Sequence, residues 1–157
     1  MRALPLAMAL LSLGCGKGPP HFLEGSLSAV MALGYATVVA QPSTDALAVR
    51  FVLPRGEAGE DTVLEVAVDL HGTAFTPGVA LDLAELSPAG QQRGSLSRNV
   101  LDDPRRTFPP LQRGTLLLDR ALEPEARVSG ELRATFENGV LAASGHTVFG
   151  TFQAGVP

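Results

Sequence analysis

Few residues of this chain combine the types and spacing that chemistry requires, and the clearest pair is Glu131 with His146. Asn138-Gly139 favours a two-residue type I′ turn, because both central residues of that turn need positive φ. Pairing outward from this turn sets Glu131 opposite His146, with Arg133 one step along. A carboxylate beside an imidazole can transfer protons or supply half of a metal site. More often it is a solvated cross-strand ion pair, which is the interpretation we favour.

A second chemically capable group lies in the irregular segment from Ser97 to Gly114. Paired arginines there can grip a carboxylate or phosphate, and a phenylalanine between prolines can present an apolar knob to a partner. The alternative, which we favour, is that Asp and Arg neutralise one another while the phenylalanine plugs the end of the core. If the chain has a binding loop, its residues are Asp102, Asp103, Arg105, Arg106 and Phe108.

Other chemistry finds little support. The three histidines, His21, His71 and His146, are far apart and lack partners at the spacing of a zinc motif. The acidic loop Gly56 to Asp61 lacks the rhythm of a dedicated calcium site. No Gly-x-Ser-x-Gly elbow and no phosphate-cradling glycine loop occurs. We therefore expect no catalytic residue, no metal and no cofactor, and a protein that is not an enzyme.

The single cysteine, Cys15, follows an apolar run from Ala3 to Leu13 that comes after one basic residue, Arg2. This order of charged, apolar and small residues is typical of a secretory signal. A membrane-spanning helix needs about 20 apolar residues, roughly twice the length of this run. The run therefore predicts export and removal of the signal, and it is too short to remain as a span.

The end of the signal, "LLSLGC", resembles the lipobox of bacterial lipoproteins, in which an aliphatic residue and two small residues precede the lipidated cysteine. Gly14 and Cys15 match that pattern, whereas Leu13 is larger than usual and Ser12 stands where leucine is preferred. The resemblance implies a diacylglyceryl thioether and an acylated amine, with chains such as palmitate, on Cys15. Two or more acyl chains make a stable anchor. The alternative is an ordinary cleaved signal with an incidental cysteine.

Gly16 in place of Asp looks like release to the outer membrane of a Gram-negative envelope; the alternative is a periplasmic or secreted soluble protein. We divide the chain into a signal peptide (1–14), a lipidated Gly/Pro tether (15–21) and a single β-rich domain (22–157). Loss of Arg2 leaves 11 basic and 16 acidic residues, a net charge of about −5. This mild acidity argues against nucleic acid as a partner.

The domain follows a period of two residues, which is typical of half-buried strands. We expect long strands in "ALAVRFVLP", "TVLEVAVDL" and "GVALDLAEL", with Val79, Leu81 and Leu83 inward in the last. Shorter strands are expected at Gly25 to Met31, Tyr35 to Ala40, Gly94 to Val100 and Gly114 to Leu118. Turn residues separate them at roughly ten-residue spacing. The fold class is therefore all-β, an antiparallel β-sandwich of roughly 7–9 short strands, with a closed β-barrel as the alternative.

The chain is expected to end in a C-terminal hairpin around Asn138-Gly139. Its core face would carry Val128, Leu132, Phe136, Leu141 and Phe149. This hairpin is similar to the closing hairpin of uncharacterised secreted β-sandwich lipoproteins, a resemblance that implies no activity.

Three function classes remain open. The first is a membrane-anchored envelope lipoprotein that binds a protein or glycan partner without catalysis, and we rank it first. The second is a carrier or chaperone with an apolar cavity for a lipid or another hydrophobic ligand, which requires a large β-cavity. The third is an enzyme, for which Glu131 and His146 are the only starting point.

Overall fold

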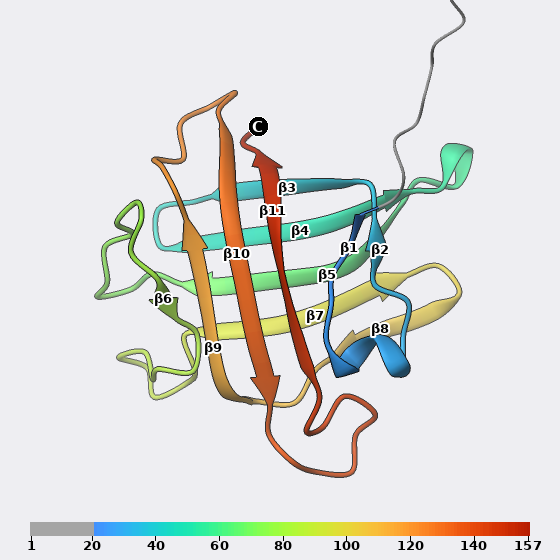
Figure 1. The fold of residues 1–157 in the computed structure, drawn as a ribbon. Coiled ribbons are helices and arrows are strands. Elements are labelled where there is room, and N and C mark those ends of the chain that lie inside the picture. The colour runs from blue at the N-terminus through green and yellow to red at the C-terminus, as the bar shows by residue number, and fades with distance from the viewer. Residues whose placement is uncertain (1–20) are drawn as a thin grey trace, which may run out of the picture.

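The computed structural model describes residues 21–157, without the side chains of 104 and 105. The fold is all-β, as the alternating pattern predicts, with nine strands in one curled sheet and two short strands in another (Figure 1). The predicted signal peptide and Cys15 lie outside the described residues. In chain order the elements are β1 (His21–Phe22), the 3-10 helix η1 (Ser26–Ala29), β2 (Gly34–Tyr35), β3 (Thr37–Pro42), β4 (Ala46–Pro54), the 3-10 helix η2 (Gly56–Ala58), β5 (Glu60–Asp69), β6 (Leu81–Asp82), β7 (Gly94–Val100), β8 (Asp103–Thr107), β9 (Leu111–Leu118), β10 (Arg127–Phe136) and β11 (Thr147–Gly155).

The large sheet has the order β6-β9-β10-β11-β3-β4-β5-β7-β8 and folds over on itself. The strands β9, β10 and β11 cross over β3, β4, β5 and β7 at a steep angle and form a second layer (Figure 1). All neighbours in this sheet are antiparallel except β11 and β3, which run parallel. Because β6 and β8 end the sheet without pairing to one another, the described chain forms an open sandwich or half-barrel. Between residues 21 and 157 we find no helix with the length and hydropathy of a membrane span.

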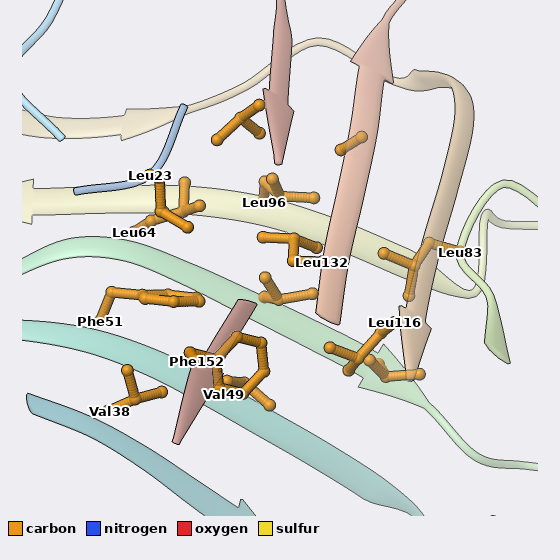
Figure 2. Close-up of a cluster of buried hydrophobic side chains, with 14 of the residues drawn as sticks. Leu23, Val38, Val49, Phe51, Leu64, Leu83, Leu96, Leu116, Leu132 and Phe152 are labelled. Carbon is orange, nitrogen blue, oxygen red and sulfur yellow. The ribbon is translucent and has the colours of Figure 1, made fainter. Parts of the chain in front are cut away.

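The core lies between the two layers and is made by the inward half of each alternating strand. Figure 2 shows Phe51 and Val49 of β4 beside Phe152 of β11, with Leu132 of β10 nearby. The rings of Phe51 and Phe152 meet edge to face at 5.1 Å, an arrangement that aromatic pairs prefer. Phe51, Val49 and Leu132 are completely buried, so strands from both layers fill a common interior.

Close packing also explains a glycine in the middle of β10. A Cβ placed on Gly130 would lie 2.4 Å from the ring of Phe152 and 2.8 Å from Leu118. No side chain fits there, because these distances are far inside van der Waals contact. Gly130 therefore lets β10 approach the aromatic centre of the core.

Strict alternation located the central strands well. The strands β4 and β7 have the bounds expected from the sequence, and β5 covers most of the predicted "TVLEVAVDL". The expected strand at Gly25 to Met31 is wrong, since Ser26–Ala29 forms η1 instead. Here the Ser28 hydroxyl donates to the Gly25 carbonyl at 2.8 Å, a local bond that competes with strand pairing.

The predicted strand "GVALDLAEL" shrinks to β6, the two residues Leu81–Asp82. Leu81 and Leu83 are buried as expected, but Val79 is 55% exposed. The chain turns before β6, where the amide of Val79 donates to the carbonyl of Thr76. The inward assignment of Val79 is therefore wrong.

The C-terminal hairpin exists, since β10 and β11 pair along their length, but its predicted register is wrong. Residues 137–146 form a ten-residue loop, and β11 begins only at Thr147. In this loop the amide of Gly145 donates to the carbonyl of Glu137, and Ala143 is buried. This loop forms in place of the tight turn at Asn138-Gly139. It changes the cross-strand partner of every later residue of the hairpin. Leu141 and Phe149 are consequently exposed, whereas Val128, Leu132 and Phe136 line the core as expected.

Candidate functional site

The candidate site is the outer face of β9, β10 and β11, where two hollows lie. Inward residues of these strands fill the core, so the intervening residues point away from it. The strand register places them in rows across the sheet, such as Thr115, Arg133 and Phe149. Figure 1 shows no other element in front of these three strands. We call this surface the outer face, and it consists of Arg113, Thr115, Leu117, Arg127, Ser129, Glu131, Arg133, Thr135, Thr147, Phe149, Thr151 and Gln153.

Two hollows indent the outer face. The larger, of about 1040 Å³, lies where β11 meets β3, and we call it the β3-side hollow. The smaller, of about 570 Å³, lies toward the other end of the same strands, and we call it the arginine hollow. Glu131 lines the first and Arg133 the second, and the two side chains are hydrogen-bonded to each other. Their ion pair therefore marks the boundary between the hollows.

The β3-side hollow exists because β11 and β3 part from each other. Their parallel pairing comprises only Ala154 with Val38 and Gly155 with Val39. Beyond it, hydroxyl and amide side chains line the opening, notably Thr37, Thr151 and Gln153. His21 lies at the rim, where its ring stacks on Tyr35 with the centroids 5.7 Å apart. The hollow offers many hydrogen-bonding groups to a partner and little net charge.

The arginine hollow has a different character, since two guanidinium groups and a phenyl ring line it. Arg113 donates through Nε to the Thr135 hydroxyl at 3.2 Å. Arg133 donates through Nε to the Glu131 carboxylate. Phe149 is 42% exposed, so a large apolar surface lies beside the two cations. This combination suits a ligand with both anionic and apolar parts.

Glu131 and His146, the pair expected from the hairpin, do not lie opposite each other. In β10, Glu131 pairs across the sheet with Thr151 and with Leu117. His146 belongs to the loop before β11, where its carbonyl accepts from the amide of Phe136 at 3.0 Å. The shifted register that exposes Phe149 also separates this pair, so the predicted cross-strand ion pair and proton-transfer pair are both wrong.

The predicted binding loop is largely a strand, because β8 pairs with β7 at the edge of the sheet. Asp103 and Arg106 neutralise each other, with Nη2 of Arg106 2.8 Å from the carboxylate. Asp102 instead pairs with Arg55 at 3.2 Å. The backbone of Arg105 lies in β8, and its side chain is not among those that the structure describes.

Phe108 does not form the exposed apolar knob that a partner could contact. It is only 7% exposed, and its ring stacks on Phe136 with the centroids 5.1 Å apart. The aromatic side chain therefore closes the end of the core, which is the alternative that the sequence favoured.

Asp61 on β5 is the buried centre of an ionic network that reaches the surface at Arg55. It is 2% exposed and accepts from Nε of Arg55 at 2.5 Å and from the amide of Leu101 at 2.9 Å. Burial raises the pKa of the Asp61 carboxyl, but these two hydrogen bonds and the charges of Arg55 and Arg98 outweigh burial and lower it overall. The nearby Arg98 is buried, and the loss of hydration lowers its pKa. The network joins the β4–β5 loop to the end of β7, so we read it as structural.

His71 has acidic partners that sequence reasoning missed. Its Nδ1 lies 2.6 Å from the carboxylate of Asp69, and its Nε2 lies 3.6 Å from that of Asp45. The hydrogen bond to Asp69 and the charge of Asp45 raise the pKa of His71. Only the two-residue spacing of Asp69 and His71 is visible in the sequence. Asp45 lies beside them because β4 pairs with β5, with Ala46 opposite Asp69. Within residues 21–157 we find no group of three or more side chains placed to hold a metal ion.

No protein-family model, curated protein or solved structure matches this chain.

Proposed function

We propose that this protein is a membrane-anchored binding module of the bacterial cell envelope that holds a protein or glycan partner without catalysis. The observation that carries the proposal is the outer face, which no other described element covers and which two hollows indent. Exposed concave surfaces of this size on rigid strands are suited to recognition. The signal and Cys15 support attachment to a membrane, in keeping with the lipobox that they resemble.

The packed interior favours this proposal over a carrier of hydrophobic ligands. A carrier needs an apolar space between its layers. Here Phe51, Leu132 and Val49 come from both layers and are completely buried against their neighbours (Figure 2). Both hollows described above open to the outer surface, and hydroxyl and charged side chains are among the residues that line them.

The anchor is tested by expressing the full chain in a Gram-negative host beside the Cys15→Ala variant. Lipidation predicts a mature product that begins at Cys15, carries added acyl mass and sediments with the membranes. The variant should lose the acyl mass and leave the membrane fraction. A wild-type product without added mass, found in the soluble fraction, would contradict the anchor and leave a periplasmic or secreted domain.

The outer face is tested by photo-crosslinking in intact cells. A photoreactive amino acid replaces Thr115 or Thr151, which are exposed and line the two hollows. The control position is Ser95, which is exposed on β7 in the other layer. We expect the same discrete adduct from one or both outer-face positions and none from Ser95. Equal crosslinking at all three positions would argue against a binding role for the outer face.

A further inference from the structure

The arginine hollow carries charge opposite to that of the chain as a whole. The protein has 16 acidic and 12 basic residues. The lining of this hollow, however, includes Arg113 and Arg133 and no carboxylate. The register sets Arg113 opposite Thr135 and Arg133 opposite Thr115, so the two arginines are diagonal neighbours on adjacent strands. Diagonal neighbours lie about 7–8 Å apart at their Cα atoms, within reach of a shared ligand.

Both guanidinium groups keep donors for a ligand. The bond from Arg113 to Thr135 uses Nε, and among the described residues Arg113 has no acidic partner. Arg133 also uses Nε, in its bond to Glu131. The side chain of Arg133 is 73% exposed, and an ion pair so exposed contributes little and yields readily to a competing anion. The remaining Nη donors of the two guanidinium groups favour carboxylate oxygens, which such paired donors can bind bidentately.

The other lining groups favour a sugar chain over a peptide. Peptides that add to a sheet do so along a free strand edge, because they need main-chain partners. The arginine hollow lies on the face of β9, β10 and β11, where main-chain groups pair within the sheet. Recognition there must use side chains, and the hollow supplies the hydroxyls of Thr115 and Thr135 beside the phenyl ring of Phe149, while the Thr147 hydroxyl is hydrogen-bonded to Ser26. Hydroxyl groups and apolar ring faces are what a glycan presents.

We propose that the arginine hollow binds an acidic glycan. Arg113 and Arg133 hold the carboxylates of uronic acid units, and Phe149 packs against the apolar face of a sugar ring. This inference rests on the proposed function, because it names the class of partner for the same outer face.

The test is a binding titration of the purified full-length chain in detergent with the tetramer of galacturonic acid. The neutral galactose tetramer and a tetraglutamate peptide of equal charge are titrated in parallel. We compare the wild type with the double variant Arg113→Gln, Arg133→Gln. The matched control is Arg120→Gln, which removes an exposed arginine paired with Asp119 outside the hollow. Thermal unfolding of each variant shows that the fold is retained.

We expect the galacturonic acid tetramer to bind, with an affinity that falls as salt is added and at least tenfold more weakly to the double variant. Arg120→Gln should bind as the wild type does, and the two other probes should bind at least tenfold more weakly. Absence of binding, an equal loss in Arg120→Gln, or equal affinity for the neutral tetramer would overturn the inference. Equal affinity for tetraglutamate would replace it with recognition of an acidic peptide.

Failure here is separable from failure of the proposed function. A discrete crosslink at Thr151, in the β3-side hollow, together with no binding of the acidic tetramer would leave the binding module standing and remove only the acidic glycan. Loss of both results would remove both proposals.

Discussion

At the scale of single residues, Asp61 is a buried carboxylate that supports the fold. Its carboxylate is 2% exposed, and it satisfies the amide of Leu101 and the guanidinium of Arg55. Without this carboxylate the amide of Leu101 loses its acceptor, whereas Arg55, whose side chain is 39% exposed, keeps Asp102 and water as partners. The substitution Asp61→Ala should therefore lower the free energy of unfolding by about 2 kcal/mol in urea denaturation, mainly through the buried amide left without a partner. Glu123→Ala, at an exposed loop position, should change it by less than about 0.5 kcal/mol.

The same carboxylate sets a pH dependence. The folded state holds the pKa of Asp61 below its ordinary value of 3.8. Its contribution to stability is therefore complete at pH above that value and is lost as the pH falls through the lower folded pKa. The stability difference between wild type and Asp61→Ala should shrink as denaturation is repeated below pH 4. A difference that stays constant down to pH 2 would contradict this assignment.

His71 responds to pH in the opposite direction. Its hydrogen bond to Asp69 and the charge of Asp45 raise its pKa above 6.5, so the protonated form is stabilised in the folded state. That stabilisation is complete below pH 6.5 and disappears as the pH rises through the folded pKa. In NMR titrations, Asp45→Asn should lower the pKa of His71, because one of the two carboxylates is lost. Asp82→Asn, on β6, should leave the titration unchanged; an equal shift in both variants would exclude a specific pair.

At the scale of elements, Gly130 shows how tightly β10 is packed. An added Cβ would meet Phe152 at 2.4 Å, and the ring cannot retreat without disturbing Phe51 behind it. We expect Gly130→Ala to lower the free energy of unfolding by about 2 kcal/mol, as overpacked cores do. Gly155, paired with Arg127 on the neighbouring strand, has no atom within 4 Å of the added Cβ. Gly155→Ala should be nearly neutral, and equal losses in both variants would show that packing is not the cause.

Sequence patterns located the elements whose signals are local. Alternation gave β4 and β7 with their bounds, because a strand with one buried face must place apolar residues at every second position. The register of the last hairpin depends on which of two connections joins its strands. The Asn138-Gly139 turn competes with a longer loop that buries Ala143, and only tertiary packing decides between them. For this reason Phe149, which was expected in the core, lies on the outer face.

The candidate site was less predictable than the fold. The sequence named the loop around Phe108, in which Asp103 pairs with Arg106 and Asp102 pairs with Arg55. The outer face joins residues from three strands, such as Thr115, Arg133 and Phe149, that are up to 34 positions apart in the printed sequence. No motif marks such a surface, because its residues become neighbours only through strand pairing.

At the scale of the whole molecule, the proposed anchor at Cys15 is close along the chain to the rim of the β3-side hollow. His21, at the rim of the β3-side hollow, lies six residues after Cys15. Six residues span at most about 20 Å when fully extended. Lipidation of Cys15 would therefore hold this hollow within about 20 Å of the acyl chains. A partner bound there would lie near the membrane surface.

The central claim is that a partner covers the outer face in the cell envelope, and thiol labelling tests it most directly. Cys15 is the only cysteine in the chain and is expected to be lipidated, so an introduced cysteine supplies the one reactive thiol. Thr115→Cys and Thr151→Cys probe the outer face, and Ser95→Cys is the matched control on β7. Each variant is labelled with a maleimide in intact envelopes and again after purification. We predict that the two outer-face thiols are protected in envelopes and react freely once purified, while Cys at position 95 reacts equally in both. Equal labelling of all three variants in both preparations would contradict the account.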